Sequence, residues 1–218
     1  MVELIPVIEI GLYNTDVPTP GKGPYWDYPT EWAQYYAECS TKSGFSDPFP
    51  FYLPGSSFCK IQDISDNNLQ KLVRDQTREM REGKYTREEA SAFFGGYVLR
   101  IDGEDRYFPQ CCGELTDIQY WQNLLLGGKI QFYQGHPQPL VTILYDTLIF
   151  DFSTDEFDEH FTPPVKDIRL EISKNDLAIA VDAVIVQLKT FSERLIAINA
   201  IEQLGILDID KLLIWGDD

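Results

Sequence analysis

Two adjacent cysteines, Cys111 and Cys112, are the residues of this sequence that could most readily carry chemistry. They follow a predicted strand and precede a predicted helix that Thr116 can cap, so the amides at the start of the helix could stabilise a thiolate. His136 or His160 could then act as the base of a cysteine-dependent hydrolase. The sequence therefore offers one candidate catalytic constellation.

The same cysteine pair also has a structural interpretation, in which one thiol is a small buried apolar group and the other packs the turn. A nucleophile elbow needs glycines two residues before and two residues after the nucleophile, and only Gly113 meets this condition, relative to Cys111. The chain contains no C-x-x-C pair that could hold zinc. We therefore expect no metal and no cofactor, and we favour a protein that is not an enzyme.

The densest acidic cluster is the sequence DFSTDEFDEH. Its spacing lacks the glycine and the ordered carboxylates of an EF-hand loop, so calcium binding is not indicated. A solvated acidic loop with an aromatic anchor is typical of a surface that binds a basic protein. The predicted binding residues are Asp151, Asp155, Glu156, Phe157, Asp158 and Glu159.

Aromatic and acidic residues also alternate near the N-terminus, in a proline-bounded stretch. This composition is typical of sugar-binding surfaces, and it leaves a carbohydrate-binding protein as a further alternative. Aromatic residues between prolines also often close a hydrophobic core from the side. The residues concerned are Tyr25, Trp26, Asp27, Tyr28, Glu31 and Trp32.

Composition limits the classes of function. The 218 residues include 35 acids and 18 bases, for a formal charge of −17, which argues against binding nucleic acid because such affinity comes largely from neutralising phosphates. A content of 44% hydrophobic residues is ample for a core. The N-terminus does not resemble a signal peptide, no apolar run is long enough to span a bilayer, and the four cysteines are unevenly spaced. A cytoplasmic location and no membrane contact are expected.

Hydrophobic periodicity predicts an α+β fold with a mixed, mainly antiparallel sheet covered by helices. We expect a single domain over residues 1–218, with a weak internal boundary at 153–164. The Asp102-Gly103 pair predicts a β-hairpin. Further strands are expected at 2–13, on a sheet edge because of Pro6, at 129–133, at 140–152 as the central strand, and at 165–172.

Five helices are expected. One follows Thr30, one spans 65–81, and one opens at the capping box Thr86–Glu89 and runs through Phe94. Another follows Thr116, and the longest spans 175–203, with Ser173 or Asn175 as its cap. The long helix would cover the sheet or form a homodimer interface, and the apolar tail at 209–215 should dock on the body.

The run FPQCCGELTDIQYWQNL at 108–124 resembles a signature of uncharacterised bacterial cytosolic proteins, in which Pro-Gln-Cys-Cys-Gly precedes an acidic residue, a leucine and a helix that bears a tryptophan. This resemblance implies no activity and assigns no catalytic residue. In size, acidity and lack of catalytic motifs, the chain is also similar to bacterial immunity proteins, which neutralise toxins. That likeness implies a cytosolic protein-interaction module that inhibits a basic toxin or another basic protein.

Overall fold

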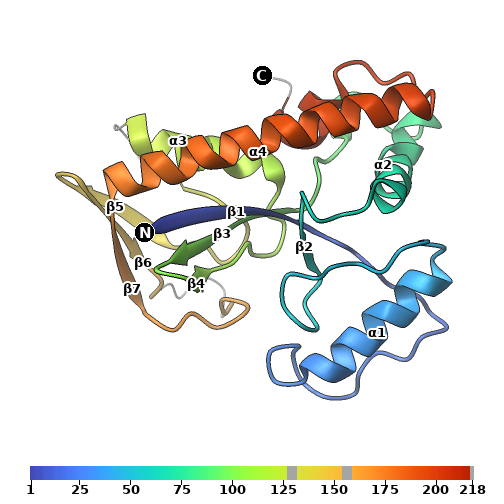
Figure 1. Cartoon of the computed structure of the whole chain (residues 1–218). Coiled ribbons are helices and arrows are strands. Elements are labelled where there is room, and N and C mark those ends of the chain that lie inside the picture. Colours follow the sequence, from blue (N-terminus) through green and yellow to red (C-terminus); the bar gives the residue numbers. More distant parts are fainter. Residues whose placement is uncertain (127–131, 154–158, 217–218) are drawn as a thin grey trace.

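The computed structural model describes residues 1–126, 132–153 and 159–216. It contains two antiparallel sheets, and most helices lie on one side of them (Figure 1). The first sheet has the strand order β2-β1-β3-β4, and the second has the order β5-β6-β7. The predicted α+β class is confirmed, but the strands of the described residues form two sheets where one was expected.

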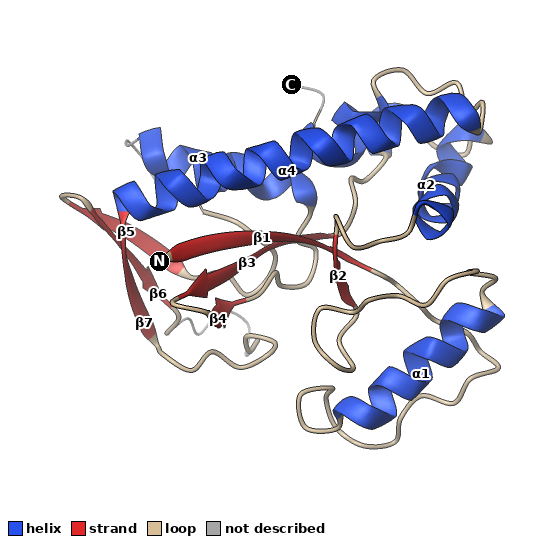
Figure 2. Cartoon of the chain, in the orientation of Figure 1, coloured by secondary structure: helices blue, strands red, loops and turns tan. Residues whose placement is uncertain are grey.

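The strands are β1 (Val2–Glu9), β2 (Phe58–Lys60), β3 (Gly95–Ile101), β4 (Glu104–Tyr107), β5 (Leu140–Leu144), β6 (Thr147–Asp151) and β7 (Arg169–Ser173). The helices are α1 (Pro29–Lys42), α2 (Asp66–Arg81), α3 (Ile118–Leu126) and α4 (Lys174–Ile201). Three single turns complete the described elements, namely η1 (Arg87–Glu89), η2 (Leu115–Asp117) and η4 (Lys211–Trp215). Figure 2 shows α2, α3 and α4 on one side of the sheets and α1 apart from them.

Strand β1 lies inside its sheet, so the prediction of an edge position was wrong. It pairs with β3 along Val2–Ile8 and with β2 only at Val7–Glu9. The carbonyl of Pro6 accepts the N–H of Ile61, and both backbone groups of a strand residue point to the same side. The missing N–H of Pro6 therefore faces the side where β2 has already ended, and the proline removes no ladder bond.

The predicted central strand at 140–152 is a hairpin formed by β5 and β6. Leu144 pairs with Thr147, and Tyr145 in the turn between them has a positive φ of 54°. The stretch contains no Asn-Gly or Asp-Gly pair, and its apolar residues on both faces hid the turn. Its inner face is buried, whereas Leu140 and Leu144 on the outer face are 64% and 56% exposed. Strand β7 begins at Arg169, later than predicted.

Helix α4 covers the first sheet, as predicted. It starts after Ser173, whose hydroxyl accepts the N–H of Asp176, and it lies across β1 in Figure 1. Val184 and Leu188 on its inner face are fully buried, whereas Val186 on its outer face is 64% exposed. A homodimer through the outer face stays a prediction.

The remaining helical predictions hold in part. Helix α2 runs from Asp66 to Arg81, close to the predicted 65–81, and Ser65 is its N-cap. The capping box of Thr86 and Glu89 is present, but the helix expected through Phe94 is a single 3-10 turn, because the chain becomes extended at Ala90. The tail docks through η4, and Leu213 accepts the N–H of Phe93.

Aromatic residues join the two sheets. Trp121 of α3 packs against Phe150 of β6, with ring centroids 5.9 Å apart, and Tyr107 of β4 packs against Phe152 at 5.4 Å. Burial of such large rings is the main favourable contribution to this contact. The two sheets therefore share one core.

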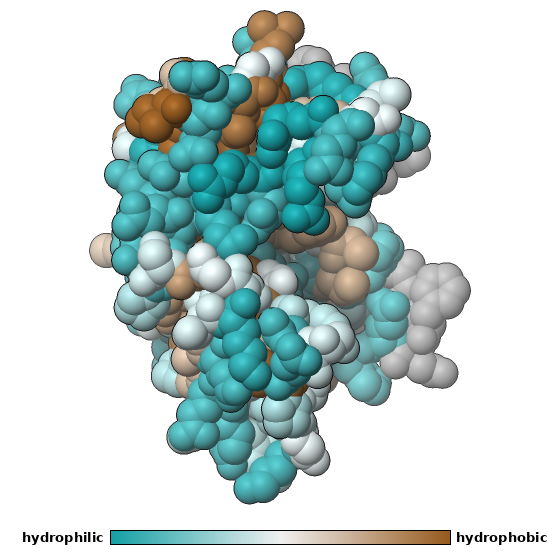
Figure 3. Space-filling view, turned by 90° about the vertical axis from the view of Figure 1, so that its right-hand side faces the viewer, coloured by the Kyte–Doolittle hydropathy of each residue, from teal (hydrophilic) through white to brown (hydrophobic). Residues whose placement is uncertain are grey.

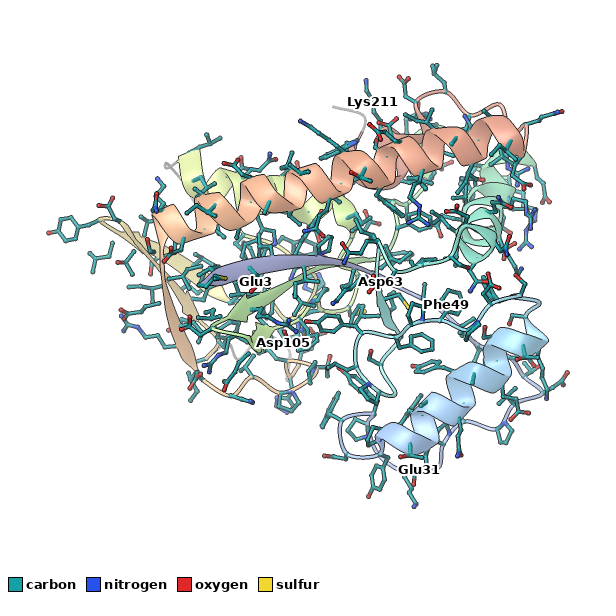
Figure 4. The ribbon with its side chains drawn as sticks, in the orientation of Figure 1. Glu3, Glu31, Phe49, Asp63, Asp105 and Lys211 are labelled. Atoms are coloured by element: carbon teal, nitrogen blue, oxygen red, sulfur yellow. The ribbon has the colours of Figure 1, made fainter. Side chains whose placement is uncertain are left out.

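Helix α1 is attached by an aromatic cluster at the edge of the main core. Tyr36 of this helix packs against Phe51 at 5.4 Å, and Phe49 packs against Phe51 at 5.8 Å. Phe49 lies between α1 and α2 in Figure 4. Tyr52, in the same segment before β2, donates its hydroxyl to Asp105 of β4 at 2.8 Å. These contacts fix the position of α1 relative to the sheet.

Candidate functional site

Cys111 and Cys112 occupy the two central positions of a β-turn. The N–H of Gly113 donates to the carbonyl of Gln110 at 3.0 Å and closes the turn. Cys112 has a positive φ of 67°, as the third residue of a type II turn requires. Both thiols are exposed, and their Sγ atoms are 3.5 Å apart. The turn therefore presents two neighbouring thiols to solvent.

Two buried glutamines hold this turn. The side-chain amide of Gln110 donates to the carbonyl of Phe108 at 2.8 Å and accepts the N–H of Thr162 at 2.8 Å. The N–H of Gln110 donates to the carbonyl of Gln134 at 3.0 Å. Because buried polar groups of this kind are costly to leave unpaired, the turn is tied to two separate segments of the chain.

The histidines do not complete a catalytic pair with these thiols. The N–H of His136 donates to the carbonyl of Cys111 at 2.9 Å, and the His136 ring packs against Tyr133 with centroids 5.3 Å apart. Within the described residues, neither cysteine sulfur forms a hydrogen bond with His136 or with His160, which is exposed. The hydrogen bond between His136 and the cysteine pair is thus made by backbone groups.

The electrostatics of Cys111 also disfavour a nucleophile at this position. The hydrogen bond with Cys112 raises the pKa of the Cys111 thiol, and partial burial and the charges of Cys112, Glu9 and Glu159 raise it further. A reactive thiolate needs the opposite shift. The arrangement therefore does not support the cysteine-dependent hydrolase.

Two carboxyl groups lie just after the turn, at the start of α3. Asp117 accepts the N–H of Glu114 at 2.9 Å, and Glu114 is the N-cap of η2, two residues before the predicted cap at Thr116. Burial raises the pKa of Asp117 to about 7, and the charge of Glu114 adds to the shift while the N–H bond opposes it. Burial also raises the pKa of Glu114.

The predicted binding loop lies largely outside the described residues, which do not include Asp155, Glu156, Phe157 and Asp158. Asp151 is the last residue of β6. Its carboxylate accepts the hydroxyl and the N–H of Ser153, and these bonds lower its pKa. Glu159 is exposed, and its charge acts on Cys111. The two described acids therefore lie at either end of that loop.

A cleft of about 680 Å³ lies between the end of β1 and one face of α2. Figure 3 shows this side of the molecule hollowed between its upper and lower parts, with apolar residues inside the hollow. The apolar lining consists of Ile8, Ile10, Leu12, Phe45, Leu72, Phe93 and Phe94. This volume is within the range of about 300–1,000 Å³ that is usual for ligand sites.

The local sequence explains how the cleft is built. The N–H of Glu9 donates to the carbonyl of Phe94 at 2.8 Å, which extends the pairing of β1 and β3. Gly95 allows this close approach, because a Cβ there would lie 2.2 Å from the carbonyl oxygen of Val7. The side chain of Gln76 on α2 donates to the carbonyl of Ala92 at 3.1 Å. Phe94 is left 42% exposed in the wall of the cleft.

The charged groups of the cleft are mostly acidic. Its lining contains four acids, Glu9, Asp75, Glu79 and Glu89, and one base, Arg78. Asp75 and Glu79 form ion pairs with lysines of the same region, at 2.7 and 3.1 Å. These pairs are roughly half exposed, so each contributes about 0–1 kcal/mol and a partner's cation can replace it.

The remaining acids of the cleft bond to neutral groups. Glu9 accepts the hydroxyl of Ser57 at 3.0 Å, and Glu89 accepts the N–H of Thr86 at 2.8 Å. No pattern in the sequence predicted a site at this cleft. The spacing of Asp75 and Glu79 places both on one face of a helix, but no local pattern indicates that Glu9 lies opposite them.

The aromatic stretch near the N-terminus packs mostly against itself. Trp32 donates its indole N–H to the carbonyl of Gly23 at 2.8 Å, and its ring lies 5.6 Å from Tyr35. Tyr25 and Trp26 are in edge-to-face contact at 5.2 Å. Trp32 therefore packs within α1 and against the loop before it, which weakens the carbohydrate-binding alternative.

Neither metal ligands nor relatives identify the site. Among the described residues, no group of three or more histidine, cysteine, aspartate or glutamate side chains could hold a metal ion. In the same part of the chain, the helices are too short or too polar to cross a bilayer. The chain matches no protein-family model, no curated protein and no solved structure.

Proposed function

We propose that this protein is an interaction module that binds a basic segment of a partner protein in the acidic cleft. The observation that carries the proposal is the combination of four acids with an apolar floor in one cleft of about 680 Å³. Carboxylates near an aromatic wall match a segment that presents lysine or arginine beside an apolar side chain. The charge of −17 adds long-range attraction for such a partner.

A protein segment fits the cleft better than a small cationic molecule. The acids are spread along three elements, with Glu9 at the end of β1, Asp75 and Glu79 on successive turns of α2, and Glu89 in η1. Phe94, at 42% exposure, offers an aromatic anchor of the kind that concentrates binding energy in protein interfaces. An extended arrangement of this kind is suited to several side chains of one partner.

The most specific version of the proposal is a cytosolic immunity-type inhibitor of a basic toxin. Its support is the strong negative charge together with the acidic cleft. Charge complementarity speeds the capture of a basic partner and disfavours other acidic proteins. A toxin and another basic protein would use the same surface, and the identity of the captured partner distinguishes them.

Two matched variants test the proposal, and each of them removes three negative charges. The cleft variant carries Glu9→Gln, Asp75→Asn and Glu79→Gln, all in exposed positions of the cleft. The control variant carries Glu171→Gln, Asp182→Asn and Glu193→Gln, which are exposed on β7 and on α4. Because both variants have the same net charge, a difference between them reports on the cleft and not on overall acidity.

Affinity capture from the source cell with the three proteins as baits is the first experiment. The proposal predicts a basic protein retained by the wild type and the control variant and lost from the cleft variant. Equal recovery of that protein by all three baits would place binding elsewhere on the surface. Activity of the captured protein, measured with and without the wild type, then shows whether it is inhibited.

A further inference from the structure

The cysteine turn contains a side chain where glycine would be more stable. Cys112, with φ at 67°, takes the third position of a type II turn, which glycine or asparagine normally fills. A residue with a Cβ is less stable than glycine in the left-handed region. Cys111 occupies the preceding position, and the hydrogen bond from His136 to its carbonyl fixes the turn. The turn thus keeps a second thiol at an energetic cost.

The two thiols are placed to react with each other and not with the other cysteines. Their Sγ atoms are 3.5 Å apart, and both side chains are exposed, so a small molecule in solvent can reach them. The other two cysteines of the chain, Cys39 and Cys59, have no exposed surface. An oxidant that enters from solvent therefore meets this pair first.

We propose that Cys111 and Cys112 form a reversible disulfide with each other by thiol–disulfide exchange with a low-molecular-weight disulfide. One thiol loses its proton, and the thiolate attacks a sulfur of the small disulfide. A mixed disulfide forms and one small thiolate leaves. The second protein thiolate attacks the protein sulfur of the mixed disulfide and releases the other small thiolate. The protein loses two hydrogen atoms, and the small disulfide is reduced to two thiols.

The surroundings of the pair affect the ionisation of Cys111. The hydrogen bond with Cys112 raises the pKa of Cys111, and the charges of Glu9 and Glu159 act in the same direction. Both thiols are exposed, so either can attack the small disulfide first, and the other then resolves the mixed disulfide. His136 and Tyr133 also lie beside the pair, in the arrangement described above.

The geometry of adjacent residues makes this disulfide easy to reduce. Neighbouring Cα atoms are about 3.8 Å apart across a trans peptide, which is shorter than the roughly 4.4–6.8 Å of ordinary disulfides. The sulfurs must also approach from 3.5 Å to a bond length of about 2.05 Å. Strain of this kind makes a disulfide more oxidising, so an excess of small thiol reopens it. The pair would therefore report on the thiol–disulfide balance of its surroundings.

Exposure of the native protein to a small excess of oxidised glutathione tests this proposal, with intact mass and titration of free thiols as the readouts. We expect the loss of two hydrogen atoms, the loss of two titratable thiols and no retained glutathione. Reduced glutathione in excess should restore both thiols. A stable glutathione adduct on the wild type, or four thiols left unchanged, would overturn the proposal.

Two serine variants test whether each thiol resolves the mixed disulfide formed on the other. Cys111→Ser should accumulate a glutathione adduct on Cys112, because the resolving thiol is gone. Cys112→Ser should likewise accumulate a glutathione adduct on Cys111, because the thiol that would resolve it is gone. Serine is close in size and keeps the turn, so both variants should stay folded. Closure to a disulfide in either variant, through Cys39 or Cys59, would contradict the assignment.

Discussion

Gln134 binds Tyr97 as a neighbouring strand would. Its Oε1 accepts the backbone N–H of Tyr97 at 2.9 Å, and its Nε2 donates to the carbonyl of the same residue at 3.0 Å. The same Oε1 also accepts the indole N–H of Trp121 at 3.0 Å. Gln134 has no exposed surface, so one side chain satisfies three buried polar groups of β3 and α3.

Replacing Gln134 by alanine should therefore destabilise the fold strongly. The change leaves two backbone groups of Tyr97 and the Trp121 indole without partners, and each unsatisfied group costs about 1–3 kcal/mol. We expect the free energy of unfolding in denaturant to fall by about 3–5 kcal/mol. Gln119→Ala, at an exposed position of α3, is the control and should change it by less than about 0.5 kcal/mol. Equal stability of the two variants would refute this role of Gln134.

Helix α4 gives a second test, because its two faces differ in burial within two residues. Val184→Asp should unfold the protein, since it buries an unpaired charge at a position with no exposed surface. Val186→Asp, at a position that is 64% exposed, should leave the melting temperature almost unchanged. Circular dichroism during heating measures both. A cooperative transition in Val184→Asp near that of the wild type would mean that α4 is peripheral.

The raised pKa of Asp117 should make the stability of the fold depend on pH. Its pKa is about 7 in the folded protein and about 3.9 in an unfolded chain, so the folded state binds the proton more tightly. Stability should therefore fall as pH rises from about 4 to about 7 and then level off. Asp117→Asn keeps an acceptor for the N–H of Glu114 but removes the charge.

The Asp117→Asn variant should match the wild type near pH 4 and exceed its stability above pH 7. A shift of about 3 pKa units corresponds to a difference on the order of 3–4 kcal/mol. Denaturant unfolding at pH 4, 5.5, 7 and 8 gives the comparison. A difference that does not vary with pH would show that ionisation of Asp117 is not its cause.

Local signals in the sequence predicted the parts of the fold that they control. Ser173 caps α4, as predicted, because its hydroxyl can accept an N–H three residues ahead. Asp102 and Gly103 both have positive φ, at 51° and 82°, in the turn between β3 and β4. Each of these features depends on only a few neighbouring residues, so no knowledge of the tertiary structure was needed.

The missed features depend on contacts between distant residues. The turn at Tyr145 lacks the usual hairpin residues, and Pro6 fits an internal strand only because β2 is short. Nothing near Gln134 in the sequence indicates that its amide completes β3, 37 residues away. The acidic cleft likewise forms only when Glu9 and α2 are brought together by the fold.

Binding of a basic partner in the acidic cleft is the proposal on which the function of this protein depends. Its most direct test is the dissociation constant of the purified captured partner for the wild type, the cleft variant and the control variant, at low salt and at about 0.5 M salt. At low salt we expect the partner to bind the cleft variant at least about tenfold more weakly than the control variant, a difference of about 1.4 kcal/mol. High salt should weaken partner binding by the wild type until it approaches that of the cleft variant. Salt screens the same charges that the cleft variant removes. Equal dissociation constants for the two variants would show that the partner does not bind in the acidic cleft.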